Sequence, residues 1–313
     1  MTGPPALSAQ NPGDNGNLEV YTGELTGAQL AQLPSAGIDL HDTAKMKGAG
    51  GRTKVEVVLT GVQAAKLADQ GIKLAVKKID GERASAKLDE RPAAESAKVY
   101  RSYSESGGIR DDLIKTAADY PEISKLESIG KSLGGQDIYA LKVTKNARAL
   151  PDGTRPAVLY LAAQHAREWI TPEMVRRLMH GTLSGYGTDP EITELVKTTE
   201  LWFIPVANPD GYDFTFTDGN RLWRKNTRDV NGDGVIKPGD GIDPNRNFPT
   251  KWGYDNEGSS PEPASETYRG SGPASEPETK ALDGLAKRLR FEYVINYHSA
   301  AELLLYGTGW QVS

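Results

Sequence analysis

The sequence contains no cysteine and only four histidines, and these two scarcities restrict the chemistry open to the protein. Without cysteine there are no disulfides, no thiolate metal ligands and no thiol nucleophiles. Any metal site must therefore be built from histidine and carboxylate side chains. The available imidazoles are those of His41, His165, His180 and His298.

Two further absences exclude whole classes of partner. The 313 residues carry 37 basic and 42 acidic side chains, a net charge of −5, whereas a nucleic-acid binder needs clustered lysine and arginine. No apolar run approaches the ~18 residues that a membrane span needs. We therefore expect neither a nucleic acid nor a membrane as partner. The length and the 37% hydrophobic content are typical of roughly two folded domains.

The N-terminal part carries a duplication. Residues 25–40 align without gaps on residues 59–74, and each copy places a threonine, Thr26 or Thr60, after a strand-like run. Such a threonine can cap a short helix, which a following glycine can end. Two β-α-β units of this kind predict a small ferredoxin-like α+β module over residues 18–78. A pair of solenoid repeats is the alternative, although two copies are few for a repeat array.

The segments around this module differ in composition. Residues 1–17 are rich in Pro, Gly and Asn, which predicts a disordered lead-in, and they lack the basic and apolar regions of a signal peptide. Residues 79–98 are highly charged, which predicts a linker or exposed helix with several basic cleavage points. Residues 99–313 form the larger domain. This order is the layout of a zymogen, although tandem domains of any kind share it.

Strand-like and helix-like segments alternate in the larger domain. Short apolar runs predict strands at Ile138–Val143, Ala157–Ala163, Leu201–Ala207 and Tyr293–Tyr297. Amphipathic segments predict helices at Ile109–Tyr120, Pro172–Leu183, Pro190–Thr198 and Pro277–Leu289. The alternation predicts an α/β fold whose central strands are buried on both faces.

Three potential metal ligands come at the ends of two of these strands. His165 and Glu168 follow Ala157–Ala163 at once, and His298 closes Tyr293–Tyr297. The carboxyl ends of strands are where such sheets gather ligands. Two neutral imidazoles and one carboxylate leave Zn²⁺ with positive charge and an open position, where water becomes acidic enough to attack a carbonyl. Alone, a His-x-x-Glu pair is more typical of a helix surface, and a single histidine of a hydrogen-bonded core.

Arginines accumulate in the sequence between these ligands. They are Arg167, Arg221, Arg224 and Arg246, and Asn245 precedes the last. The guanidinium fork binds carboxylates in a bidentate way. A metal site among these arginines therefore indicates an anionic or carboxylate-ended substrate, although any one of them could be solvated surface charge.

From about Tyr100 onward the chain resembles the zinc carboxypeptidase family of the carboxypeptidase A type. The matching segments, in the order of the family, are Gln164-His-Ala-Arg-Glu-Trp-Ile170, Pro205-Val-Ala-Asn-Pro-Asp-Gly-Tyr212, Asn220-Arg-Leu-Trp-Arg-Lys-Asn226, Asp243-Pro-Asn-Arg-Asn-Phe248 and Asn296-Tyr-His-Ser299 with Leu303–Tyr306. The resemblance implies a mixed central sheet flanked by helices. The N-terminal module and linker look like the activation segment of a secreted zymogen.

The resemblance also implies roles for single residues. His165, Glu168 and His298 would be the ligands of one catalytic zinc ion. Arg224 would polarise the scissile carbonyl and stabilise the oxyanion, an electrostatic role worth several kcal/mol in enzymes generally. The reaction would be the hydrolysis of C-terminal residues from peptides.

Substrate recognition follows from the same resemblance. Asn245 and Arg246 would grip the terminal carboxylate of a peptide or protein, Arg167 would contribute to the neighbouring subsite, and Ser299 would help to bind the substrate. An activating protease would be a second partner. Which side chain is preferred stays open, because the family's pocket residues lie mostly beyond these segments.

The chain departs from the family pattern near its last residues. Ala300 stands where the family has a tyrosine, and the family's general-base glutamate would lie beyond Ser313. Glu302 aligns with a non-catalytic position. We therefore expect a truncated gene product or a fragment. Two alternatives stay open: a non-catalytic protein that binds zinc and peptide C-termini, and a deacylase or amidohydrolase on the same scaffold.

A second metal site is predicted in a twelve-residue loop. Its expected calcium ligands are the side chains of Asp229, Asn231, Asp233 and Asp240 and the carbonyl of Val235. No helix pair flanks the loop, so a calcium-stabilised insertion is expected instead of an EF-hand. An ion there could fix the geometry of the substrate arginines. The alternative is a Gly/Asp-rich surface turn without an ion.

Overall fold

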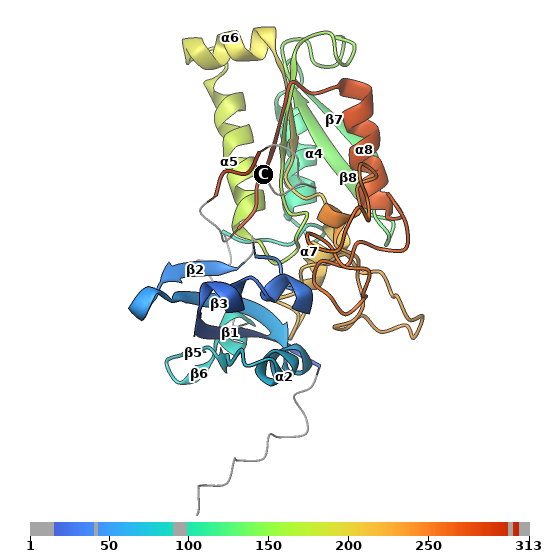
Figure 1. Ribbon diagram of the computed structural model, residues 1–313. Coiled ribbons are helices and arrows are strands. Elements are labelled where there is room, and N and C mark those ends of the chain that lie inside the picture. The colour runs from blue at the N-terminus through green and yellow to red at the C-terminus, as the bar shows by residue number, and fades with distance from the viewer. Residues whose placement is uncertain (1–15, 41–42, 90–98, 300–302, 307–313) are drawn as a thin grey trace, which may run out of the picture.

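The computed structural model describes residues 16–40, 43–89, 99–299 and 303–306 and contains two main sheets (Figure 1). A four-stranded sheet belongs to the N-terminal module, drawn in blue, and a five-stranded sheet to the larger domain. Of the predicted lead-in, only residues 16 and 17 are among the described residues. Within the described ranges, no helix combines the length and apolarity that crossing a membrane requires.

The N-terminal module alternates strands with short helices. Its elements are β1 (Leu18–Leu25), α1 (Gly27–Leu30), β2 (Ala44–Lys47), β3 (Thr53–Thr60), α2 (Gly61–Asp69) and β4 (Ala75–Val76), with 3₁₀ turns at Leu33–Ala36 and Ala49–Gly51. The strands lie in the order β2-β3-β1-β4, and all neighbours are antiparallel. The assignment of this module to the ferredoxin-like folds stays a prediction.

The duplicated threonines begin helices as the sequence indicates. The hydroxyl of Thr26 accepts from the Gln29 amide and that of Thr60 from the Gln63 amide, and in each case the glutamine reaches back to the threonine backbone. This reciprocal arrangement is a capping box, which satisfies two otherwise unpaired donors at a helix start. The two copies therefore share their helix-initiation chemistry.

The segment expected to be a linker starts with regular structure. After β4 come β5 (Lys78–Ile79), β6 (Glu82–Arg83) and α3 (Ala84–Asp89). Arg83 and Ser85 both donate to the carboxylate of Glu19 in β1, and Ala84 is buried. Residues 79–89 thus contact the module through these side chains, and the mostly exposed helix α3 is one of the two structures expected for this segment. The rest of the predicted linker, residues 90–98, lies outside the described residues.

The larger domain follows with helices on both sides of its sheet. Its elements are α4 (Ile109–Asp119), β7 (Ser124–Lys131), β8 (Asp137–Val143), β9 (Ala157–Leu161), α5 (Ile170–Gly185), α6 (Pro190–Thr198), β10 (Glu200–Ile204), α7 (Pro209–Phe214), a 3₁₀ turn at Pro244–Arg246, α8 (Pro277–Leu289) and β11 (Tyr293–Asn296). The strand order is β11-β9-β10-β8-β7. β9 is parallel to β10 and β11, whereas β8 is antiparallel to its neighbours, so the sheet is mixed, as expected.

The sheet is the middle of three layers (Figure 1). Alternate residues of a strand point to opposite faces. In β10, Leu201 and Phe203 pack with α4 and α5, while Trp202 and Ile204 pack with α8. The α/β fold and the burial of this central strand on both faces are therefore confirmed.

Strand β11 differs from the burial expected of it. Its Tyr293, Val294 and Ile295 side chains are exposed, because β11 forms the edge of the sheet in the described part of the chain and pairs there with β9 alone. β7 at the opposite edge was not predicted. Its pattern is interrupted by a register shift between Ser128 and Gly130, which disturbs the alternation that would reveal a strand.

Candidate metal centre

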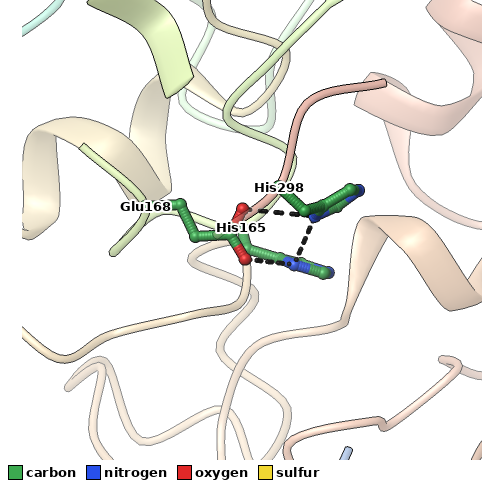
Figure 2. Close-up of side chains that lie close together, drawn as sticks. All are labelled: His165, Glu168 and His298. Carbon is green, nitrogen blue, oxygen red and sulfur yellow. Dashed lines mark hydrogen bonds and ion pairs between the residues drawn. The ribbon is translucent and has the colours of Figure 1, made fainter. Parts of the chain in front are cut away.

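His165, Glu168 and His298 converge on one point, although more than a hundred residues separate the first from the last (Figure 2). Nδ1 of His165 lies 2.9 Å from Oε1 of Glu168 and 3.0 Å from Nδ1 of His298. Oε2 of Glu168 lies 3.2 Å from Nδ1 of His298. Among the described residues, no other group of three histidine or acidic side chains gathers in this way.

The chain turns sharply to deliver His165 to this point. Ala163, just past the end of β9, has a φ of 48°, a left-handed conformation that costs a non-glycine residue ~1–2 kcal/mol. The turn is held by Thr171, whose hydroxyl accepts from the Ala163 amide and donates to the Glu168 carbonyl. The backbone that carries His165 and Glu168 is therefore fixed before any ligand binds.

Asp243 orients the first imidazole. Its Oδ1 lies 3.2 Å from Nε2 of His165, and its Oδ2 accepts from the guanidinium of Arg224 at 2.8 Å. A hydrogen bond from Nε2 to Asp243 turns Nδ1 of His165 toward Glu168 and His298, which is the usual outer-sphere arrangement of a metal-binding histidine. Nothing in the sequence pattern predicts a role for Asp243. It stands two residues before Asn245 in a matching segment, but 78 residues of chain separate it from His165.

The electrostatics of the cluster favour a cation. Burial lowers the pKa of His165, but the carboxylates of Asp243 and Glu168 outweigh it and raise the pKa to about 9. Burial raises the pKa of Glu168, yet His165 and His298 bring it down to about 2. Burial likewise opposes ionisation of Asp243, but Arg224 and His165 hold its pKa well below the usual range. Two ionised carboxylates thus face the His165 ring in a buried site.

The donor set fits a zinc ion. A tetrahedral site with metal–ligand distances of ~2.0–2.1 Å needs donor atoms ~3.3 Å apart, and the three observed separations lie between 2.9 and 3.2 Å. The Glu168 side chain is 2% exposed and its two oxygens face one imidazole each, so a cation between the rings would be held by a buried carboxylate. The separations of the donor atoms and the burial of the Glu168 carboxylate therefore both suit a zinc ion.

The predicted catalytic arginine, Arg224, and the predicted substrate residue Arg246 both contact a carboxylate of the N-terminal module. Oδ2 of Asp39 lies 3.0 Å from Nη2 of Arg224 and 2.5 Å from Nη2 of Arg246. The side chain of Asp39 is 7% exposed and that of Arg224 is fully buried. The arginines therefore accept a carboxylate beside the metal ligands, and here the chain itself provides it.

The other predicted residues lie around this point. Arg167 pairs with Glu266 at 2.8 Å, and Nδ2 of Asn245 lies 3.5 Å from Nε2 of His298. Ser299 directly follows His298 and is half-buried. Ala300 and Glu302 lie outside the described residues.

Arg221 lies in a second cluster. Its guanidinium stacks 3.8 Å above the ring of Trp169 and donates to the carbonyl of Arg167. The same tryptophan ring stacks on Phe216 with a centroid separation of 4.1 Å. Arg221 is thus held by an aromatic pair beside the metal centre, where α3 of the module also contributes Leu88 to a small cavity.

The predicted calcium loop is closed by hydrogen bonds from its own backbone. The carboxylate of Asp229 accepts from the amides of Gly232 and Gly234, and Asp240 accepts from Val230 and Lys237. Asn231 accepts from the Asp233 amide, and Asp233 accepts from Val235 and pairs with the Lys237 side chain. Within the described chain its three aspartates do not gather as closely as the ligands of the histidine site.

Comparison with known proteins identifies the family. Residues 109–313 match the family model described as zinc carboxypeptidase. Carboxypeptidase A4 of Mus musculus is 36% identical over 214 residues, which are 68% of this chain and 48% of that protein. Carboxypeptidase A2 of Rattus norvegicus is 30% identical over 271 residues, or 84% of this chain and 62% of that protein.

A solved structure gives the same result for the fold. The crystal structure of carboxypeptidase A from Helicoverpa armigera superposes with a TM-score of 0.71 and 25% identity, covering 94% of this chain and 72% of that one. The fold and the His–Glu–His cluster define a metallopeptidase-like domain. The chain belongs to the zinc carboxypeptidase family. It spans about half the length of the curated relatives that it matches.

Proposed function

We propose that this chain is the precursor form of a zinc metallocarboxypeptidase that removes C-terminal residues from peptides and proteins outside the cell. The observation that carries the proposal is a carboxylate, Asp39, bound to Arg224 and Arg246 beside the three converging metal ligands. A substrate's terminal carboxylate has the same charge and shape. Family membership supports the reaction class.

The metal ligands would be Nδ1 of His165, the carboxylate of Glu168 and Nδ1 of His298. A bound zinc ion would supply Lewis-acid polarisation of the scissile carbonyl and would make water a stronger nucleophile near neutral pH. Asp243 would accept a hydrogen bond from Nε2 of His165 and so present Nδ1 to the metal, as its contact with Nε2 supports. The protein's own contribution is thus a buried set of donors whose ring orientation is set by Asp243, and zinc binding would displace a proton from His165.

The substrate would be held by charge. Arg246 and Asn245 would bind its terminal carboxylate, and Arg224, fully buried and already oriented by Asp243, would stabilise negative charge on the carbonyl oxygen. Arg167 and Ser299 would contact the residue upstream. An arginine fixed in advance loses little freedom when charge develops, which is the condition for effective electrostatic stabilisation.

The contacts that cover these arginines support the proposal of a precursor form. Ile38, Asp39 and Val58 of the module, together with Arg167 and Glu266, line a small cavity above the site. The Ser265 hydroxyl donates to the carbonyl of Gly37 in the same interface. While docked, the module competes for the arginines. An activating protease that cuts in residues 90–98 would allow it to leave.

A peptide assay distinguishes this function from its alternatives. The protein is treated with trypsin, supplied with zinc and incubated with an N-acetylated peptide that ends in a free carboxylate or in an amide, and mass spectrometry follows the products. We expect the free acid to bind and, in a protein that carries the family's general-base glutamate, to lose its C-terminal residue. The amide should bind ~10- to 100-fold more weakly because it lacks a charge-assisted hydrogen bond worth ~1.5–3 kcal/mol.

The other outcomes are equally informative. Binding of the free acid without loss of a residue would identify a non-catalytic protein that holds peptide C-termini. Removal of the acetyl group or conversion of the amide would identify a deacylase or amidohydrolase. Equal affinity for the free-acid and the amidated peptide would contradict the assignment of Arg246 and Asn245 as the residues that bind the terminal carboxylate.

We also propose that the 229–240 loop binds calcium through the side chains of Asp229, Asn231, Asp233 and Asp240 and the carbonyl of Val235. The left-handed Gly232 and Gly234 and the amides that orient Asp229 support a loop shaped to point oxygens inward. The close contact between the Lys237 ammonium and Asp233 indicates that this position attracts a cation.

Calcium is expected to raise the thermal unfolding temperature, because an ion that binds only the folded loop stabilises it by mass action. At a hundredfold excess over the dissociation constant the gain is ~2.7 kcal/mol. The measurement is differential scanning fluorimetry with calcium or a chelator, and Asp229→Asn should remove most of the shift. An identical unfolding temperature in calcium and in chelator would contradict the calcium site.

A further inference from the structure

The two histidine-bearing segments are joined by a pair of carboxamides. Gln164 precedes His165, and Asn296 stands two residues before His298. Nδ2 of Asn296 donates to Oε1 of Gln164 at 2.6 Å. Gln164 is 1% exposed, so this hydrogen bond lies inside the protein directly behind the metal ligands.

This bond is the main polar partnership of both side chains. Nε2 of Gln164 and Oδ1 of Asn296 are buried and have no hydrogen-bond partner in the described chain. A buried carboxamide without a partner is costly. Each side chain therefore depends on the other, and the removal of either leaves a buried polar group unsatisfied.

The hydrogen bond between Gln164 and Asn296 lies just past the last paired residues of β9 and β11. β9 and β11 are parallel, with Leu161 opposite Asn296, and the amide of Tyr297 donates to the carbonyl of Leu161 at 2.8 Å. Beyond these residues the backbone pairing of β9 with β11 ends, and each segment continues to its histidine. The hydrogen bond between the Gln164 and Asn296 side chains links the two segments there.

The backbone of Gln164 is also held by Asn208, from the segment that follows β10. Nδ2 of Asn208, which follows β10, donates at 3.1 Å to the Gln164 carbonyl and also to the Lys225 carbonyl beside Arg224. The backbone of Gln164 is thus bonded to the N-cap residue of α7, four residues after β10, and its side chain to β11. With the left-handed turn at Ala163, this leaves the segment before His165 little freedom.

We propose that Gln164 and Asn296 are positioning residues that fix the separation of the two imidazoles and thereby set zinc affinity and coordination geometry. They touch neither the metal nor the substrate and act through His165 and His298. The inference rests on the zinc site of the proposed function. It predicts that zinc binding depends on the hydrogen bond between these two side chains, although neither of them is a metal ligand.

The test compares zinc affinity in a competition titration against a chromogenic chelator, using the full chain. Gln164→Met keeps the length of the side chain and removes its hydrogen bond. We expect zinc to bind about tenfold more weakly, at the lower end of the effects seen for outer-sphere partners. Asn296→Leu removes the same bond from the exposed edge of the sheet and should weaken zinc similarly, which keeps the test available if the buried glutamine variant does not fold.

A reciprocal exchange separates positioning from general stability. Gln164→Asn or Asn296→Gln alone alters the combined length of the bridge, whereas the double exchange restores it and should recover zinc affinity and the visible spectrum of the Co²⁺-substituted protein. Gln136→Met is the matched control, because Gln136 is a part-buried glutamine bonded to Asp210 and Asp213 in the turn between β7 and β8. It should leave both readouts unchanged.

The outcomes distinguish two kinds of failure. If the unaltered chain bound no zinc, the proposed function itself would be wrong. If it bound zinc and both Gln164→Met and Asn296→Leu matched it in affinity and Co²⁺ spectrum, the positioning role alone would be overturned. A double exchange as weak as its worse single variant would also contradict the proposal.

Discussion

Replacing Glu168 with glutamine is expected to abolish stoichiometric zinc binding. The substitution keeps the shape of the side chain and removes the charge that faces His165 at 2.9 Å and His298 at 3.2 Å. Loss of an outer-sphere partner typically weakens metal affinity 10- to 100-fold, so loss of a direct ligand should exceed about 100-fold. Metal analysis of the purified protein after dialysis measures the effect.

A nearby glutamate provides the matched control. Glu173 lies on α5, is 4% exposed and pairs with Arg176 at 2.6 Å instead of with a histidine. Glu173→Gln should lower the free energy of unfolding, since it breaks a buried ion pair, and should leave zinc content intact. Full zinc retention by Glu168→Gln would refute the ligand assignment.

Replacing Asp39 with asparagine is expected to open the substrate site. Asp39 is the carboxylate that meets Arg224 and Arg246, and breaking a buried ion pair costs ~3–5 kcal/mol because a charge is left without compensation. That cost falls on the docked state of the module. A peptide with a free C-terminal carboxylate should therefore bind at least tenfold more tightly to the variant, as measured by isothermal titration in the presence of zinc.

The control for this prediction is a carboxylate of the same module that faces solvent. Asp69 ends α2 and is exposed, so Asp69→Asn should change peptide affinity little. An amidated peptide should gain no affinity from Asp39→Asn. If the free-acid peptide bound the Asp39 variant and the unaltered chain equally, the module would not be competing for the arginines.

Glu168 and Asp39 lie at the two ends of one connected set of buried side chains. Asp243 touches His165 through one oxygen and Arg224 through the other, so metal ligand and substrate arginine share one buried carboxylate. Asp39 then reaches Arg224 from the module. The site is therefore continuous from zinc ligands to the module, and removal of the module would expose it as one unit.

The starts of several helices could be predicted because they depend on residues next to one another in the sequence. α6 and α8 begin at Pro190 and Pro277, as expected from the fixed φ of proline and its missing amide hydrogen at a helix start. The capped helices of the N-terminal module follow from Thr26 and Thr60 in the same way. Four strands of the larger domain begin within one residue of their predicted positions.

The metal ligands were predicted from the strand ends on which they stand, and the structure brings them together. Their supporting contacts were beyond sequence reasoning. Asp243 and Asp39 are ordinary aspartates in the sequence, and their partners lie 78 and 185 residues away. The folding of the larger domain places Asp243 beside His165, and the packing of the module on that domain places Asp39 beside Arg224. The edge position of β11 depends in the same way on strand order, which no periodicity reveals.

The most direct test is a crystal structure of the chain grown with zinc, with anomalous data collected at the zinc absorption edge. The account predicts one strong anomalous peak in contact with Nδ1 of His165, the Glu168 carboxylate and Nδ1 of His298, with Asp39 still bound to Arg246. No peak at this position, or a peak bound through Nε2 of His165 with Asp243 displaced, would contradict it.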